Sequence, residues 1–187
     1  MRDGSRTRSS IRAAALRLFV ERGVDGVSVR DIADASGVRP STLYVHWPSK
    51  EAMVAQMFSE GYDAYGRRIS AAAFGEHGFR RRLEAMIRAI CRLHDEDRHL
   101  FQFLLLSQHA CLARVAVANS PVEALHAEVA LAVARGEAAG DPALLTAAVV
   151  GVVVQAATFH LYGSIGRSLG EAADDIVALC LRLFADA

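Results

Sequence analysis

The sequence predicts an all-α protein, and three observations lead to that expectation. Hydrophobic side chains recur with the period of a helix from end to end, whereas no run alternates as the strands of a sheet do. The chain is rich in Ala and has only 4 Pro in 187 residues, a mixture that favours helices. Capping residues stand before several of the periodic segments. A chain of this length forms one or two small domains with a sizeable core.

The first predicted helix carries an apolar stripe on one face and charged side chains on the other. Ser9 or Ser10 is expected to cap its start, and Gly23 to close it. The stripe consists of Ile11, Ala14, Ala15, Leu18 and Phe19. A helix of this kind buries one face against a core and leaves the other in water.

Two short helices joined by a turn are expected next, over residues 28–35 and 39–46. Ser28 stands three residues before Asp31, a variant of the capping box. Pro40 falls in the first turn of the second helix, where its missing N–H costs nothing. Two short helices with a glycine-containing turn form the helix-turn-helix pattern.

A small core explains the residue types within this pattern. Ala33 is expected to be small because the second helix crosses close to it, and Leu43 fills the angle between the two helices. Gly37 can take a positive φ in the turn. Ile32 and Val38 complete the predicted core.

The rest of the chain is expected to be helical as well. The predicted helices cover residues 50–72, 79–94, 100–109, 121–139, 142–169 and 171–184. The stretch 143–166 has no charged residue and is long enough to cross a bilayer. Its glycines and polar side chains favour instead a helix buried in protein, so we expect no membrane partner.

Charge divides the chain into a basic front and an acidic rear. Residues 1–50 hold nine basic and five acidic side chains, a net charge of +4, and residues 51–187 have a net charge of −4. We therefore expect two domains, over residues 1–50 and 51–187. The basic domain is the one suited to a negatively charged partner.

The three cysteines predict a reducing compartment. Cys91, Cys111 and Cys180 are odd in number and irregularly spaced, so they support no disulfide framework. Arg12 and Arg17 interrupt the first apolar stretch, which therefore does not read as a signal peptide. A cytoplasmic location follows as the expectation.

The block from Ser28 to Glu51 carries a family resemblance, together with the segment 15–23 before it. The residues that carry it are Ile32-Ala33, Gly37-Val38, Leu43-Tyr44, His46 and Ser49-Lys50-Glu51. This block closely resembles the DNA-binding segment of the TetR family of bacterial transcriptional regulators. Trp47 stands where that family usually has Phe, and it is expected to fill the same aromatic core position. The remaining residues match the family in architecture alone, so the ligand's identity does not carry over.

The resemblance implies a ligand-responsive transcriptional repressor that binds a palindromic operator in double-stranded DNA as a homodimer. Residues 1–50 would form its helix-turn-helix domain, and residues 51–187 a helical ligand-binding and dimerisation domain. The last two long helices of each subunit would pair into a four-helix bundle. A small, mostly apolar effector would release the DNA. The alternative is that both helices are buried within one subunit.

The helix that begins at Arg39 is expected to lie in the major groove with its first residues at the base edges. The predicted DNA-binding residues are Ser28, Arg30, Arg39, Ser41, Thr42, Tyr44, His46 and Lys50. Arg39 can pair with guanine O6 and N7 together, although it can equally hold a phosphate or remain a solvated cap. Tyr44 is expected at a phosphate or a thymine methyl, and its alternative is a half-buried core position.

Lys50 is the only lysine of the chain and lies in the first turn of its helix, where an ammonium and free amide N–H groups can bind one phosphate. The alternative is an exposed surface charge. His46 is expected to be structural rather than base-reading. Arg2, Arg6 and Arg8 form a basic tail that either enters a minor groove or stays in solvent.

Aromatic, Met and polar side chains on the rear helices suit a mostly apolar effector pocket with one or two orienting hydrogen bonds. The candidates are Met86, Ile90, His94, Phe101, Phe103, Leu106, Gln155, Phe159 and Tyr162. The same mixture is also that of an ordinary core. No cofactor and no resident metal are expected.

A group of potential metal ligands and thiols on the rear helices is consistent with another kind of regulator. Cys91 and His94 share a helix face next to Asp95, Asp97 and His99, which raises a metal-sensing or thiol-sensing regulator of the same fold. A solvated turn between helices is the simpler interpretation. The chain lacks the GxSxG, GxxxxGK[ST] and HExxH motifs, so an enzyme, or a helical carrier without DNA binding, is the least favoured class.

Overall fold

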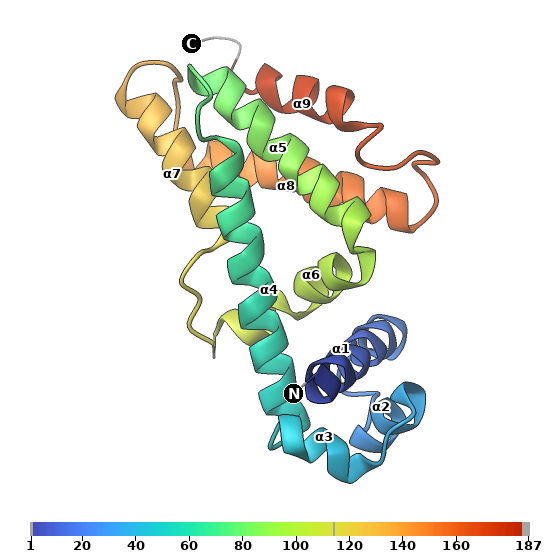
Figure 1. Ribbon diagram of the computed structural model, residues 1–187. Helices are drawn as coiled ribbons and strands as arrows, with labels where there is room; N and C mark the ends of the chain where they lie inside the picture. Colours follow the sequence, from blue (N-terminus) through green and yellow to red (C-terminus); the bar gives the residue numbers. More distant parts are fainter. Residues whose placement is uncertain (1, 114, 185–187) are drawn as a thin grey trace. The chain divides into compact units, whose positions relative to one another are not determined.

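The computed structural model describes residues 2–113 and 115–184, and the side chains from residue 4 onward. Within these residues every regular element is an α-helix, which confirms the predicted fold class (Figure 1). The helices are α1 (Arg2–Arg22), α2 (Val29–Ser36), α3 (Pro40–His46), α4 (Lys50–Ala72), α5 (Phe79–Glu96), α6 (Arg98–Leu112), α7 (Pro121–Ala134), α8 (Pro142–Leu161) and α9 (Ala173–Arg182).

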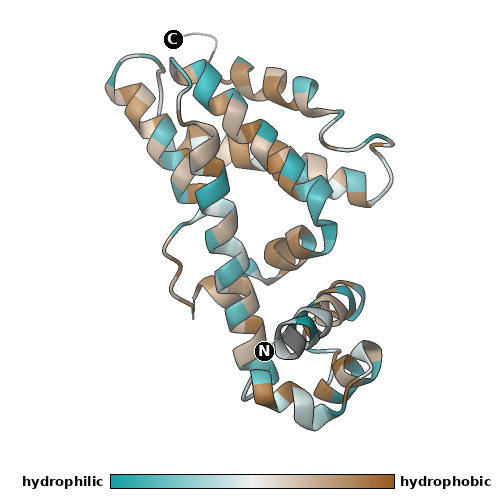
Figure 2. Ribbon diagram, viewed as in Figure 1, coloured by the Kyte–Doolittle hydropathy of each residue, from teal (hydrophilic) through white to brown (hydrophobic). Residues whose placement is uncertain are grey.

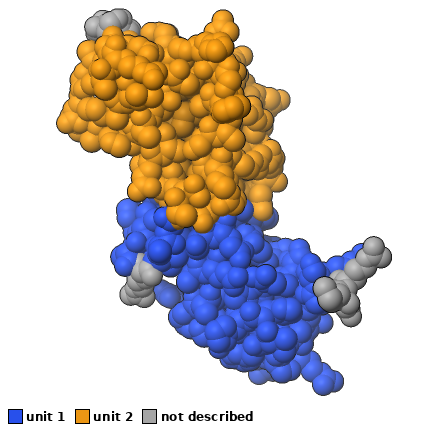
Figure 3. Space-filling view, turned by 60° about the vertical axis from the view of Figure 1, so that its left-hand side comes forward, with its two compact units in different colours: residues 1–61, 99–117 blue, residues 62–98, 118–187 orange. Residues whose placement is uncertain are grey.

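The chain forms two compact units, drawn in two colours in Figure 3. The first unit comprises residues 1–61 and 99–117, and the second comprises residues 62–98 and 118–187. This division differs from the boundary expected at residue 50. The first unit groups the first half of α4 and nearly all of α6 with the three amino-terminal helices, so it draws on two separate stretches of chain.

Close packing explains why α6 joins the first unit. A Cβ added to Gly61 of α4 would lie 3.0 Å from a methyl of Leu100 and 3.2 Å from one of Leu104. The ring of Phe103 stacks on that of Phe19, with 5.8 Å between ring centroids. These contacts make α6 part of the same core as α1.

The helix-turn-helix is built as its sequence predicts. Ser28 caps α2 in a reciprocal capping box with Asp31, and Gly37 ends the helix in the left-handed region at φ 69°. Ala33 and Leu43 are fully buried where α2 meets α3. Only a glycine takes this turn without strain, and a small residue at position 33 lets the two helices approach each other.

The second unit is a bundle in which α5 packs against α7, α8 and α9, while α8 also packs against α7 and α9 (Figure 1). One face of α5 supplies much of the buried core. Its residues there are Phe79, Leu83, Met86, Ile87, Ile90 and Leu93. The Arg82 guanidinium lies 2.6 Å from the Glu128 carboxylate, which joins α5 to α7 by a shielded ion pair.

Two helix boundaries differ from those predicted. Helix α1 begins at Arg2 rather than at Ser9 or Ser10, because the first ten residues contain no proline to prevent a helix. Helix α8 ends at Leu161 rather than near residue 169. Gly163 adopts φ 75°, and the amide of Ser164 donates back to the carbonyl of Phe159, which closes the helix.

Helix α8 has most of its surface uncovered by its own chain. It is long and apolar enough to cross a membrane by length and composition, and 22% of its apolar window is buried within the chain. The buried residues form one stripe, namely Thr146, Val149, Val153 and Ala157. The alternative that this helix is buried within one subunit is therefore wrong, and its pairing with a second subunit stays a prediction. Figure 2 shows the largely apolar character of α8.

Candidate nucleic-acid interface

Helix α3 presents several of the predicted DNA-binding residues outward. Arg39 is its N-cap and is exposed, and Ser41 follows it on the surface. The side chain of Tyr44 is 54% exposed and that of Val45 is 80% exposed. Leu43 alone of this short helix is buried. The helix thus anchors on one side chain and keeps a broad face open to solvent.

Arg39 and Arg30 are available for a partner. Both side chains are exposed, and among the described residues neither forms an ion pair or a hydrogen bond. Arg39 precedes α3 in an extended conformation, with φ −78° and ψ 147°. A guanidinium that already pairs with internal groups gains little from pairing with a DNA phosphate or base. Arg39 and Arg30 have no such internal partner among the described residues, so both can pair with DNA.

Ser28 serves mainly as a helix cap. Its hydroxyl and its backbone N–H both contact the Asp31 carboxylate, and the Asp31 amide donates to its Oγ at 3.2 Å. The hydrogen bond from the Ser28 hydroxyl is the largest of the effects that lower the pKa of Asp31. The predicted contact of Ser28 with DNA remains a prediction, since its side chain is exposed but engaged.

The Lys50 ammonium is held by backbone carbonyls. Its Nζ donates to the carbonyl oxygens of Val24 and Val27, at 2.9 Å each. The side chain is half-buried, so the alternative of an exposed surface charge is wrong. Lys50 links the first turn of α4 to the turn before α2, and one of its three N–H donors remains for a phosphate.

A polar network surrounds Trp47 at the end of α3. Its indole is buried and donates to Gln56 Oε1 at 2.9 Å, and the His46 ring packs against it with centroids 5.6 Å apart. The Arg8 guanidinium lies 5.3 Å from the indole centroid, a cation–π distance. These contacts agree with a structural role for His46.

Glu60 ties the amino-terminal part of α1 to α4. Its carboxylate accepts from Arg12 at 3.0 Å, from Arg8 at 3.5 Å and from Gln56 at 2.7 Å. The Arg8 side chain is therefore paired within the first unit rather than fully solvated. Arg6 is exposed, and the side chain of Arg2 lies outside the described residues.

The predicted effector residues do not form one group. Phe101, Phe103 and Leu106 belong to the first unit, and the other six belong to the second. Met86, Ile90 and His94 are buried along one face of α5.

Four of the effector candidates are exposed, against the expectation that they face inward. They are Leu106, Gln155, Phe159 and Tyr162, of which Tyr162 is 79% exposed. Gln155 and Phe159 lie on the open face of α8, and Tyr162 follows its end. Their contact with an effector stays a prediction.

A polar pair lies inside the second unit between α5 and α8. The His94 and His160 rings meet edge to face, with centroids 5.2 Å apart. His94 Nδ1 is 3.0 Å from the Asp95 carboxylate, which also accepts the amides of Leu169 and Gly170. Burial lowers the pKa of His94, and His160 and Arg98 add to this, while Asp95 opposes it.

One ring nitrogen of His160 has no hydrogen-bond partner among the described residues. Its Nδ1 contacts the carbonyl of Ile165 at 3.1 Å, whereas its Nε2 is buried and has no hydrogen-bond partner among the described residues. A buried polar atom left without a partner destabilises a protein by about 1–3 kcal/mol. No sequence pattern pointed to His160, because the contact depends on how α5 and α8 pack.

The cysteines and the predicted metal ligands give the sensing alternatives little support. Cys91, Cys111 and Cys180 are buried, and burial raises the pKa of Cys91 and of Cys180 to about 11. Such thiols stay protonated and inert. In the described ranges, no three His, Cys, Asp or Glu side chains lie together as a metal would require.

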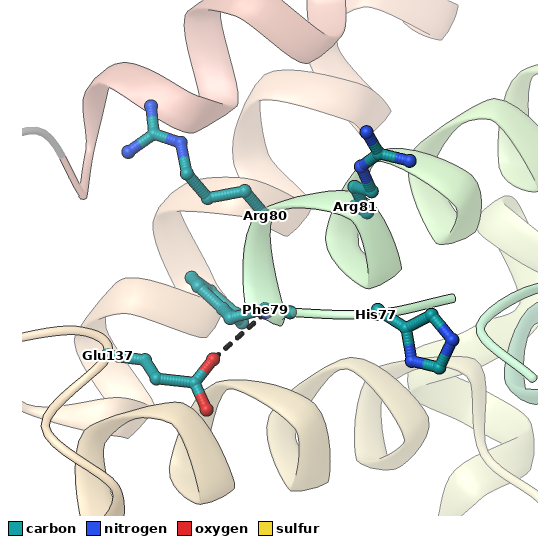
Figure 4. Close-up of a pocket in the computed structure, with 6 residues that line it drawn as sticks. His77, Phe79, Arg80, Arg81 and Glu137 are labelled. Atoms are coloured by element: carbon teal, nitrogen blue, oxygen red, sulfur yellow. Dashed lines mark hydrogen bonds between the residues drawn. The ribbon is translucent and has the colours of Figure 1, made fainter. Parts of the chain in front are cut away.

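A surface hollow of about 280 Å³ lies at the start of α5 (Figure 4). It is lined by His77, Gly78, Phe79, Arg80, Arg81 and Glu137, none of which was among the predicted effector residues. The Glu137 carboxylate already accepts the amide of Phe79 at 2.9 Å. This helix start thus has an internal anion in place.

The sequence of the chain is similar to that of known transcriptional regulators. Residues 11–57 match the model of the bacterial regulatory proteins of the tetR family. The chain is 35% identical over 106 residues to the HTH-type transcriptional repressor KstR2 of Rhodococcus jostii strain RHA1, covering 50% of this chain and 51% of that protein. It is 42% identical over 50 residues to KstR2 of Mycobacterium tuberculosis strain H37Rv, covering 27% and 25%. The chain thus spans about half the length of the first relative and a quarter of the second.

Solved structures share the fold over nearly the whole chain. A bacterial regulatory protein of the tetR family from Rhodococcus RHA1 matches this chain with a TM-score of 0.80 at 19% identity. The match covers 95% of this chain and 96% of that protein. The regulator FadR from Bacillus subtilis, solved in complex with stearoyl-CoA, has a TM-score of 0.73 at 17% identity and covers 96% and 99%. At these identities the likeness concerns the fold.

Proposed function

We propose that the chain, whose residues 11–57 match the TetR family of bacterial regulatory proteins, is a transcriptional repressor of that family that binds operator DNA. The observation that carries the proposal is the outward face of α3, with Arg39 and Tyr44 exposed beside a well-anchored Leu43. A helix held by one buried side chain can enter the major groove without losing its packing. Arg30 and Lys50 supply positive charge around it.

The protein acts as a homodimer through α8 and α9. Large apolar side chains are exposed on these helices or just beyond their ends, namely Leu144, Phe159, Tyr162, Leu179 and Leu183. A Cβ added to Gly151 of α8 meets nothing within 4 Å, so the helix offers a close approach to a partner. Such a face is stable in water only when it is covered. Two subunits bring two recognition helices to a palindromic site.

A small, mostly apolar effector releases the DNA. It binds in the second unit, where Met86 and Ile90 are buried in an apolar interior. The buried Nε2 of His160 can accept one hydrogen bond there, because Nδ1 donates to the carbonyl of Ile165. The fatty-acyl thioester bound by the FadR neighbour makes stearoyl-CoA the first effector to test.

Helix α4 couples the two functions. Its residues up to Gly61 belong to the first unit and those from Tyr62 to the second, so a change in its direction alters the spacing of the two recognition helices. Because binding energies are linked, the effector and the DNA weaken each other's affinity by the same factor, typically about 5–150-fold.

The repressor works in the cytoplasm and regulates rather than catalyses. The odd number and irregular spacing of its three cysteines suit a reducing compartment, and the KstR2 relatives are named as transcriptional repressors.

Fluorescence anisotropy of the protein–operator complex tests the effector. Rising stearoyl-CoA is expected to weaken operator binding, and operator DNA to weaken stearoyl-CoA binding by an equal factor. The His160→Phe variant should bind operator normally and respond less to stearoyl-CoA. Operator affinity that stays unchanged at saturating stearoyl-CoA would contradict release by this effector class.

A further inference from the structure

Val45 is an exposed apolar side chain on the recognition helix. It is 80% exposed, more than any other large apolar residue of α3. It stands four residues after Ser41 and one after Tyr44, both exposed, so the three share the open face of the helix. Neither the family match nor the expected set of DNA contacts gives it a role.

The core of the first unit does not require a valine here. Leu43 and Trp47 on either side are buried and hold α3 in place. A short exposed helix without another purpose for this position would favour a polar or unbranched residue, since valine is a weaker helix former. Val45 is therefore free to make a contact outside the subunit.

We propose that Val45 is a specificity-determining residue that contacts the 5-methyl group of a thymine in the operator, which rests on the proposed function. The thymine methyl is the apolar feature of the major-groove edge of the bases, and apolar side chains recognise it by contact. Val45 lies one helical turn beyond Ser41, about 6 Å further along α3. It therefore reads a base pair beyond those within reach of Arg39.

The chemistry of valine suits this task. Its branched side chain has few rotamers, so little conformational freedom is lost when it meets the methyl group. It has no hydrogen-bonding group and gains nothing from a phosphate, unlike its neighbours Arg39 and Tyr44. Val45 thus adds sequence preference without adding general affinity for DNA.

A thymine-to-uracil scan tests the proposal. Operator is first selected from random duplex DNA with the full-length protein, and each thymine is then replaced in turn by deoxyuridine, which lacks only the methyl group. The wild-type protein should lose about fourfold in affinity at one thymine of each half-site, the effect of one methyl group withdrawn from water. The Val45→Ala variant should bind thymine and uracil operators equally at that position.

Two controls keep the result interpretable. Val122→Ala changes an exposed valine of α7 and should keep the wild-type scan. Thermal unfolding of Val45→Ala should match the wild type, because the side chain is mostly exposed. A scan in which no thymine matters, or in which Val45→Ala loses as much as the wild type, would overturn the role of Val45 while leaving operator binding intact. Failure to select any operator would overturn the proposed function, and Val45's role with it.

Discussion

The Lys50 ammonium donates a 2.9 Å hydrogen bond to the carbonyl of Val27, the residue just before the cap of α2. It donates a second bond to Val24, so a side chain at the start of α4 holds the turn between α1 and α2. The chain has no other lysine. The angle at which α2 and α3 leave α1 therefore depends in part on one ammonium group.

Replacing Lys50 by Ala should lower both stability and DNA affinity. Hydrogen bonds from a charged donor contribute about 1.5–3 kcal/mol each, and two are lost while the carbonyls regain water, so the free energy of unfolding in urea should fall by roughly 3 kcal/mol. Binding to operator and to random DNA should weaken by similar factors, because the change affects positioning and charge rather than base reading. Lys50→Arg should recover part of both. Unchanged urea unfolding would contradict the structural role.

Replacing Arg39 by Ala should relax base preference. A bidentate contact with guanine contributes about 1–3 kcal/mol of discrimination, so operator binding should weaken about 5–150-fold while binding to random DNA changes much less. Competition titrations with both DNAs measure the two effects. Arg92→Ala, an exposed arginine of α5, is the matched control. Equal losses on both DNAs would mean that Arg39 holds a phosphate.

Stability should fall as the pH drops below about 6.5, the ordinary pKa of histidine. Burial lowers the pKa of His94 in the folded state, so the unfolded chain binds its proton first and acid favours unfolding. One such group changes the free energy of unfolding by up to about 1.4 kcal/mol per pH unit. Urea unfolding at pH 7 and pH 5 should show a smaller difference for His94→Gln than for the wild type.

The pKa of Asp95 bears on a lower pH range. Burial raises it, but the hydrogen bonds from His94 and from the amides of Gly170 and Leu169 outweigh this and lower it. The stability that Asp95 contributes is therefore present above about pH 4 and lost below it.

For His94, the contradicting result is an equal pH dependence of unfolding in the wild type and in His94→Gln between pH 7 and pH 5. That result would assign the effect to other histidines.

Replacing Gly151 by Leu should separate the subunits without unfolding them. The site is open within one chain, so the helix content measured by circular dichroism should be kept. A large side chain would hold two copies of α8 apart, and light scattering should then report the monomer mass. Gly166→Leu, at another open position outside α8, should remain dimeric. A dimer of unchanged affinity in Gly151→Leu would place the interface elsewhere.

Local signals predicted the fold well. Ser28, Ser120 and Asp141 cap α2, α7 and α8, because a cap depends on residues only two or three positions away. Helix α4 runs over Lys50–Ala72 as expected. The capping and turn residues of the helix-turn-helix were enough to predict its small core.

The sequence pattern did not predict contacts between residues far apart in the chain. The partners of Lys50 lie 23 and 26 residues away, and no local rule joins an ammonium to those carbonyls. The exposure of Phe159 and Tyr162 was not predicted. The hydrophobic pattern of an apolar helix is the same whether its own chain or a second copy covers it, so the pattern does not tell the two apart. The predicted DNA-binding residues remain predictions, which the binding measurements on the Lys50 and Arg39 variants test.

Footprinting of the selected operator tests the central claim most directly. The account predicts two protected half-sites related by a twofold axis, one helical turn or a multiple of it apart, with contacts in the major groove that Arg39→Ala removes. Protection of a single site, or binding no tighter than to random DNA of the same length, would contradict it.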